Sequence, residues 1–228
     1  MGLRILWIAL GAALGLLCRV LCDRLTGHLL QRREKPCEAS RPERLLGTVL
    51  SVAAGGLIGL LAESFAEAAY FFLLLIPSQT AALADLRARV IPNEMVLALL
   101  GVTLLFGIPG ALGAEGFPAW RPLLALLGLV VCFVIFLLPA ALSKQVGAGD
   151  IKLAGAMGFC LGLWGGLFAV VLMGLMVLAY TVLQYRIPTL IFLKSKIPMG
   201  PFLAAAMVGM LLLEKLPLAA ELLAAMPL

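Results

Sequence analysis

The sequence predicts an all-α protein, a polytopic integral membrane bundle of about eight transmembrane helices. The composition is one reason: 63% of the 228 residues are hydrophobic and 13% are charged, whereas soluble domains are about 45–50% apolar and about 25% charged. The mean hydropathy of +1.12 agrees with this. The spacing is the other reason, because apolar runs near the roughly 20 residues of a spanning helix recur along the chain. We therefore expect residues 1–228 to form a single membrane domain.

The apolar runs fall at eight places. Ile151 to Leu183 is too long for one crossing, and Gly162, Gly165 and Gly166 favour a break within it. The segment before that break is short and follows a glycine-rich loop, which is typical of a helix that does not cross the membrane fully. The expected segments are 3–22, 45–62, 66–84, 95–113, 122–142, 151–163, 165–184 and 199–216.

The lysines and arginines predict the orientation of this bundle. Cytoplasmic loops of membrane proteins carry an excess of Lys and Arg. With the N-terminus outside, 14 of the 17 basic residues lie in inner loops or at inner helix ends. The remainder are Arg4, Arg121 and Lys215. The sequence thus predicts that both termini are outside and that residues 23–44 form a short basic cytoplasmic loop.

Several functional classes are disfavoured. A net charge of +5 would suggest nucleic-acid binding in a soluble protein, but these charges cluster in loops, so membrane lipid is the expected partner and nucleic acid is not. The single histidine, His28, lies in the basic loop and suits no serine triad. Cys18, Cys22, His28 and Cys37 are poorly spaced for zinc. We expect no metal, no cofactor and free cysteine thiols.

Two of the three aspartates, Asp85 and Asp150, fall at the same predicted depth, at the cytoplasmic ends of their helices. Two carboxyl groups a few ångströms apart cannot both ionise easily, so such a pair shares one proton. The ionised member can take a proton from water while the protonated member polarises a carbonyl group. This is the chemistry of amide hydrolysis without a metal. The simpler interpretation is that each acid lies in the aqueous interface near Arg87 or Lys152.

The surroundings of the two acids are unusual. Ser78, Ala81 and Ala82 form a stripe of small residues on the helix face of Asp85, which would let another helix or an extended peptide approach closely. Gly147 and Gly149 precede Asp150 and permit unusual backbone angles, close approach and movement. Lys152, two residues after Asp150, points away from it on a helix, so we expect a separate contact for this lysine.

Three motifs resemble those of type IV prepilin peptidases, which are membrane aspartyl proteases of the GxGD kind. They are ADLRARVIPN at 84–93, which includes Pro92 and Asn93, then GAGDIKL at 147–153 and KIPMGPFLA at 196–204. The resemblance implies that Asp85 and Asp150 are the catalytic pair. It implies prepilins or pseudopilins as substrates, cleaved after the glycine that ends a basic leader. It also implies a bacterial-type inner membrane, with cleavage at its cytoplasmic face.

The chain departs from the larger members of that family in its first loop. Those members carry a cytoplasmic domain with two CxxC pairs, whereas residues 23–44 hold Cys37 alone. We therefore expect no zinc site and no N-methylation of the product. A basic leader would favour acidic partners, here Asp23, Glu34, Glu38, Glu43 and Glu94. Two alternatives stay open: a GxGD protease of other membrane signal peptides, and a proton-coupled transporter.

Overall fold

The described part of the chain is helical throughout. The computed structural model describes residues 2–35, 39–117, 120–143, 147–186 and 197–216. These residues contain helices and turns with no strand, and six of the helices are long and apolar enough to cross a membrane. The prediction of an all-α membrane bundle is confirmed. The helices are α1 (Gly2–Gln31), α2 (Arg41–Leu61), α3 (Phe65–Ala88), α4 (Asn93–Ala111), α5 (Pro122–Ser143), α6 (Ala148–Arg186) and α7 (Gly200–Leu213).

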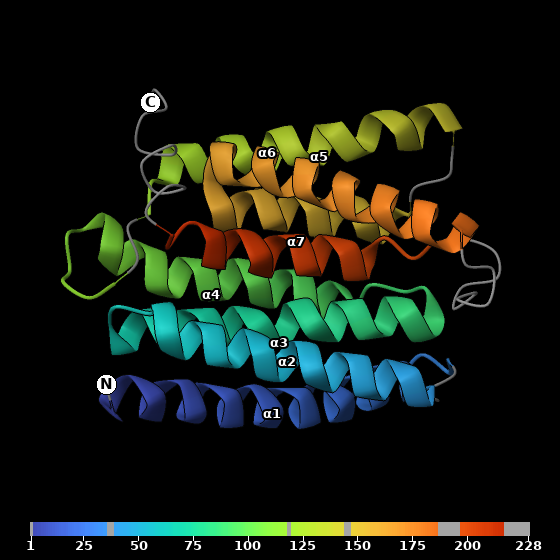
Figure 1. The fold of residues 1–228 in the computed structure, drawn as a ribbon. Coiled ribbons are helices and arrows are strands. Elements are labelled where there is room, and N and C mark those ends of the chain that lie inside the picture. Colours follow the sequence, from blue (N-terminus) through green and yellow to red (C-terminus); the bar gives the residue numbers. More distant parts are fainter. Residues whose placement is uncertain (1, 36–38, 118–119, 144–146, 187–196, 217–228) are drawn as a thin grey trace.

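The predicted break within α6 lies at Gly162. This residue has φ 72° and ψ −175°, a left-handed conformation that favours glycine. A Cβ atom on Gly166 would lie 3.1 Å from the Cα of Gly158, although residues eight apart in a continuous helix are about 12 Å apart along its axis. The two arms of α6, 148–161 and 163–186, therefore fold back on each other (Figure 1).

The predicted cytoplasmic loop 23–44 is shorter than expected, because α1 continues to Gln31 and α2 begins at Arg41. The composition becomes polar at Asp23, but buried positions continue with helical spacing at Cys22, Thr26, Leu29 and Leu30. At the start of α2, Ser40 and Glu43 form a capping box, in which each side chain bonds the other residue's backbone N–H.

Glycines set the distance between α1 and α2. A Cβ on Gly55 would lie 2.3 Å from the carbonyl oxygen of Gly11, and one on Gly15 would lie 2.2 Å from that of Ser51. A Cβ on Gly59 would likewise lie 2.3 Å from the carbonyl oxygen of Trp7. The two helices are therefore in backbone contact, which is how small residues pack membrane helices together.

We expect Gly55→Ala to destabilise the protein by about 1–3 kcal/mol, because the added methyl group would overlap the backbone of α1. Gly56→Ala is the matched control, since its Cβ would meet nothing nearer than 3.7 Å. Unfolding by SDS in mixed micelles measures the difference. Equal midpoints for the two variants would show that this close contact does not stabilise the bundle.

α3 and α7 form the centre of the bundle. In Figure 1, α1 and α2 lie on one side of this pair, and α5 and α6 lie on the other. α3 contacts α1, α4 and α7, and α7 also contacts α6. Leu74 and Ala81 of α3 are fully buried and belong to one core with Met157 of α6 and Leu203 and Met207 of α7. This arrangement brings the end of α3 beside the starts of α6 and α7.

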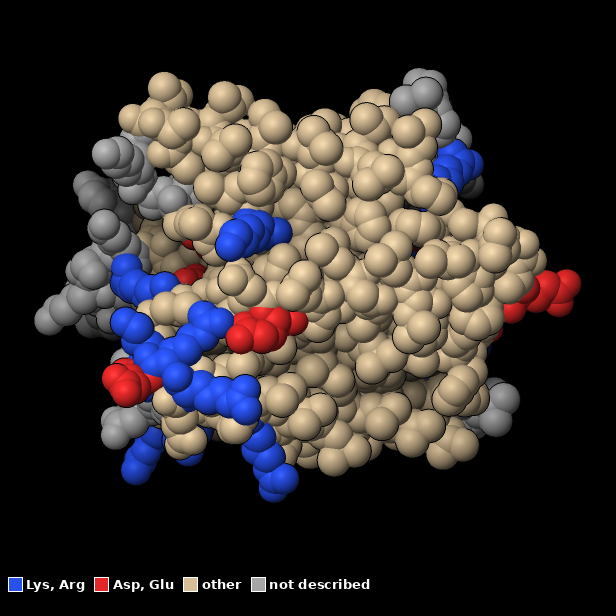
Figure 2. Space-filling view, turned by 180° about the vertical axis from the view of Figure 1, so that it is seen from behind, with Lys and Arg blue, Asp and Glu red and all other residues tan. Residues whose placement is uncertain are grey.

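Charges gather at the ends of the molecule and leave an apolar belt between them (Figure 2). Large apolar side chains are exposed along this belt, for example Leu17, Leu46 and Val171. We call the end where α3 stops and α4 starts the basic end. Its described basic residues include Arg24, Arg32, Arg33, Lys35, Arg41, Arg44, Arg87, Arg89 and Lys152; Lys144, Lys194 and Lys196 lie outside the described residues.

Candidate functional site

Asp85 lies in the last turn of α3 at the basic end, and its residue is 7% exposed. The helix stops at Arg89, whose φ of 53° is left-handed and whose charge acts on Asp85. The Asp85 Oδ2 atom accepts a hydrogen bond from the backbone N–H of Gly200, with an N–O distance of 2.8 Å. Gly200 is the first residue of α7. Asp85 therefore lies at a helix N-terminus, where negative charge is favoured.

Asp150 lies in the first turn of α6. Its Oδ2 atom accepts a hydrogen bond from the backbone N–H of Gly147, 3.2 Å away. Its Oδ1 atom is buried and has no hydrogen-bond partner among the described residues. Buried carboxylate oxygens usually have such a partner, so this oxygen is available to a ligand that can donate a hydrogen bond.

The two carboxyl groups lie close enough for the charge of Asp85 to act on Asp150. The linker between α3 and α4 helps to hold them there. Gly149 packs on Ile91 of this linker so closely that a Cβ on the glycine would lie 2.9 Å from the Ile91 Cβ. Lys152 Nζ donates to Asn93 Oδ1 over 3.2 Å. The start of α6 is thus attached to the segment that follows Asp85.

These contacts refine what was expected of the glycines and of Lys152. Neither Gly147 nor Gly149 has a positive φ, so glycine is not needed here for an unusual backbone angle. Its small size instead lets neighbouring side chains lie close to the backbone. A Cβ on Gly147 would lie 3.0 Å from the Asp150 Oδ2 atom. α6 already begins at Ala148, so Asp150 is on a helix and not in a loop. Lys152 makes the separate contact that was expected, with Asn93.

The small-residue stripe on α3 does not form an open docking surface. Ser78 and Ala81 are 0% exposed, and Ala81 belongs to the core shared with α6 and α7. Ser78 Oγ donates to the carbonyls of Leu74 and Leu75 in its own helix. The stripe packs the protein's own helices, and only Ala82 keeps partial exposure. In the VIPN motif, Pro92 is buried and Asn93 is exposed.

The acids expected to receive a basic leader are mostly paired within the chain. Arg87 has a side chain that is 4% exposed. It bonds Asp23 of α1 and, with an Nε–Oε1 distance of 2.8 Å, Glu43 of α2. Glu94 pairs with Arg33 at 2.8 Å but stays 55% exposed. Glu34 is exposed, and Glu38 lies outside the described residues. Glu34 and Glu94 are therefore the described acids that remain accessible.

The described cysteines show no arrangement for a metal. Cys18 and Cys22 are buried in α1, where Cys22 Sγ donates to the carbonyl of Ile76. Across the described ranges, no group of three or more His, Cys, Asp or Glu residues is placed to hold a metal ion. The four described cysteines, Cys18, Cys22, Cys132 and Cys160, are free thiols, and Cys37 lies outside those ranges.

Sequence reasoning missed two features of the site. Gly200 supplies the hydrogen bond to Asp85, and a Cβ there would lie 2.8 Å from both the Cβ and the Oδ2 of Asp85. A glycine followed by Pro201 at the start of an apolar run was the available indication, because proline is favoured in the first helical turn. The buried pairs of Arg87 with Asp23 and Glu43 were the second feature, and no local pattern predicts pairs this distant in sequence.

The fold and this site define a class of protein: a polytopic membrane helix bundle with two carboxyl groups at the same end. Residues 68–182, which contain both aspartates, match a family model described as the type IV leader peptidase family. Because the match spans half of the chain, the protein belongs to the type IV leader peptidase family, and the resemblance seen in the sequence is confirmed. No curated protein and no solved structure matches the chain.

Proposed function

We propose that the protein is a prepilin peptidase, an aspartyl endopeptidase of a bacterial-type inner membrane. It cleaves prepilins or pseudopilins after the glycine that ends their basic leader, at the cytoplasmic face. The observation that carries this proposal is that Asp85 and Asp150 both lie at the basic end, near enough for the charge of one to act on the other. Membership in the leader peptidase family supports the reaction class. The excess of Lys and Arg at that end supports the orientation.

The two carboxyl groups would divide the work of amide hydrolysis. Asp85 is the better candidate for the ionised member, because it accepts the Gly200 N–H at the start of α7. It takes a proton from water as the water oxygen attacks the glycine carbonyl carbon. Asp150 gives its proton to the carbonyl oxygen. When the C–N bond breaks, the leaving nitrogen takes the proton from Asp85 and a hydroxyl group of the intermediate returns a proton to Asp150, which gives the carboxyl group of the leader and the amine of the mature protein.

The substrate would reach the pair from the Asp150 side. Asp85 is buried, whereas Gly147 and Ala148 are exposed and Gly149 and Asp150 are half-buried. Asn93 and Lys152, joined by their hydrogen bond, are exposed beside this approach. Glu94 follows Asn93 on α4, and its side chain is exposed although it is paired with Arg33. It could therefore release Arg33 and bind a basic residue of the leader instead.

Purified protein in lipid–detergent micelles should cut a synthetic prepilin segment at one bond, directly after the glycine. Mass spectrometry of the products identifies the bond. The mature fragment should carry an unmethylated amine when S-adenosylmethionine is present. The matched control is the same segment with leucine in place of that glycine, which should stay intact. Cleavage of a remnant signal peptide but not of prepilin segments would instead favour a related protease with a different substrate.

A further inference from the structure

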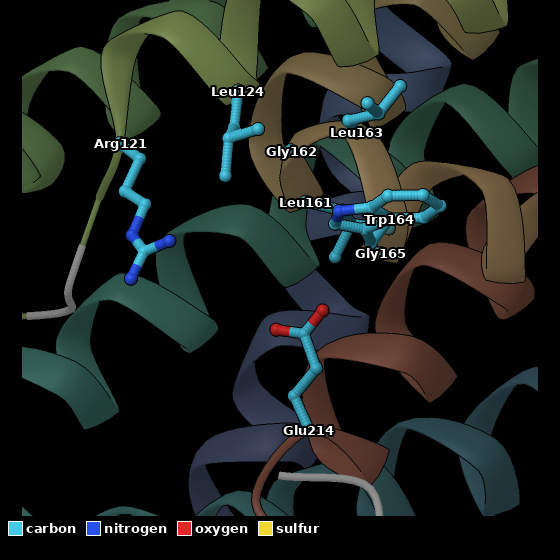
Figure 3. Close-up of a pocket in the computed structure, with 8 residues that line it drawn as sticks. All are labelled: Arg121, Leu124, Leu161, Gly162, Leu163, Trp164, Gly165 and Glu214. Atoms are coloured by element: carbon cyan, nitrogen blue, oxygen red, sulfur yellow. The ribbon is translucent and has the colours of Figure 1, made fainter. Parts of the chain in front are cut away.

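A cavity lies at the opposite end of the bundle from the aspartates. It has a volume of about 210 Å³ and is lined by the start of α5, the break in α6 and the residue after α7. Arg121 and Glu214 extend into this space from different sides, and Trp164 lies on a third side (Figure 3). α7 runs from Gly200 beside Asp85 to Leu213, so the cavity is about 20 Å from the aspartates along that helix.

The Glu214 carboxylate lines this cavity. It lies over the start of the second arm of α6, where a Cβ on Gly165 would be 2.5 Å from the Glu214 Oε1 atom. Glu214 also borders a neighbouring cavity of about 200 Å³, which is lined by Glu67, Tyr70, Trp120 and Lys215 among others. Glu67 and Lys215 form an ion pair there. Glu214 therefore faces both spaces from the end of α7.

Other groups in the two cavities favour an anion or a hydrogen-bond acceptor. Arg121 precedes α5, and the second arm of α6 begins after Gly162, so residues at the starts of two helices line the first cavity. Helix N-termini carry partial positive charge and attract phosphate groups. In the neighbouring cavity the indole N–H of Trp120 is buried and lacks a hydrogen-bond partner among the described residues. An acceptor oxygen would satisfy it.

The cavity thus has Arg121 on one side and the Glu214 carboxylate on another, and leucine side chains complete its lining. Leu124 and Leu161 line it, and Leu123 and Leu126 are exposed on the adjoining turn of α5. A ligand that matches this pattern has a phosphate, a nearby cation and an apolar part. We propose that the cavity binds the head group of a zwitterionic phospholipid with a primary ammonium, its phosphate toward Arg121 and its ammonium toward Glu214.

The same geometry predicts selectivity among lipids. A primary ammonium donates N–H hydrogen bonds to a carboxylate, whereas the quaternary ammonium of a choline head group has no N–H to donate. An anionic head group such as glycerol phosphate has no cation to pair with Glu214, and the Glu214 carboxylate would repel its negative charge. Phosphatidylethanolamine should therefore be preferred over phosphatidylcholine and phosphatidylglycerol.

Native mass spectrometry of the full chain, with these three lipids added in equal amounts, tests the proposal. We expect the wild type to retain phosphatidylethanolamine at least about tenfold better than the other two, the size of one charge-assisted hydrogen bond. Glu214→Gln should remove the preference for ethanolamine over choline, and Arg121→Gln should weaken all three. Glu115→Gln, at an exposed acid outside both cavities, is the control and should behave as wild type.

A further variant and a competition experiment separate recognition of the head group from a general loss of structure. Gly165→Ala leaves both charges present but displaces the Glu214 carboxylate, and it should also lose the preference. Soluble glycerophosphoethanolamine should compete with the lipid, whereas inorganic phosphate alone should not. Lipid retention is compared only among variants whose SDS-unfolding midpoint equals that of the wild type, so that a loss of structure does not account for a change. Equal retention of the three lipids by the wild type, or an unchanged preference in Glu214→Gln, would overturn the proposal.

Discussion

Asp85→Asn and Asp150→Asn are each expected to abolish cleavage of a prepilin segment, with a loss of at least about 10²–10⁴-fold in rate. The amide keeps the shape of the carboxyl group but can neither accept a proton from water nor give one to a carbonyl. Both variants should reach the membrane and unfold at the SDS midpoint of the wild type to within a small shift. The measurement is single-turnover cleavage followed by mass spectrometry.

The double variant separates a shared mechanism from two independent roles. If the carboxyl groups act as one unit, Asp85→Asn combined with Asp150→Asn should be no slower than either single variant. Glu115→Gln again serves as the control. Because a pair that shares one proton works in one protonation state, wild-type activity should fall toward both acid and alkaline pH. Full activity in either single variant would exclude the two-aspartate mechanism.

Gly200→Ala is expected to reduce kcat/KM by about 10²-fold, the loss that a displacement of about 1 Å can cause in an active site. The added Cβ would lie 2.8 Å from the Cβ and Oδ2 of Asp85, so either the carboxyl group or the start of α7 must move. The hydrogen bond from the Gly200 N–H would be stretched or lost. Gly200 has no side chain that could react, so any loss of activity would come from the displacement of Asp85.

Gly209→Ala on the same helix is the matched control. Its Cβ would meet only Leu172 Cδ2, at an ordinary distance of 3.5 Å. Both alanine variants favour helix formation equally, so a difference in activity between them reports on Asp85. Equal activity of Gly200→Ala and wild type would show that the contact between α7 and Asp85 has no part in the reaction.

Much of the fold follows from the sequence because membrane-length apolar runs have few other solutions. The predicted breaks fall near the observed helix ends, and the turn at Gly162 follows from a run too long for one crossing. α1 was predicted to end too early, since its polar last turns are held by buried Leu29 and Leu30 rather than by lipid. The composition of a segment does not show whether other helices of the protein will bury it.

The candidate site was predictable in part for a similar reason. Asp85 and Asp150 stand out as rare acids at one depth, and orientation alone brings them to the same end. Whether Ser78 and Ala81 face a substrate or the protein's own core depends on which helix packs beside them, and periodicity does not reveal that partner. The pairs of Arg87 with Asp23 and Glu43 span 64 and 44 positions in the sequence. They follow from the packing of α1, α2 and α3.

The two helices that begin at the site are short for a membrane. α7 has 14 residues, and the first arm of α6 ends at Gly162 after a similar length. Each is therefore about 21 Å long, compared with a hydrocarbon thickness of about 30 Å. Other helices rather than lipid surround them, because α7 is central and the first arm of α6 is buried at residues such as Leu153 and Met157. We expect the ends of these short helices at the aspartates to lie below the level of the surrounding head groups, which would let bulk water enter the bundle and reach the bond that is cut.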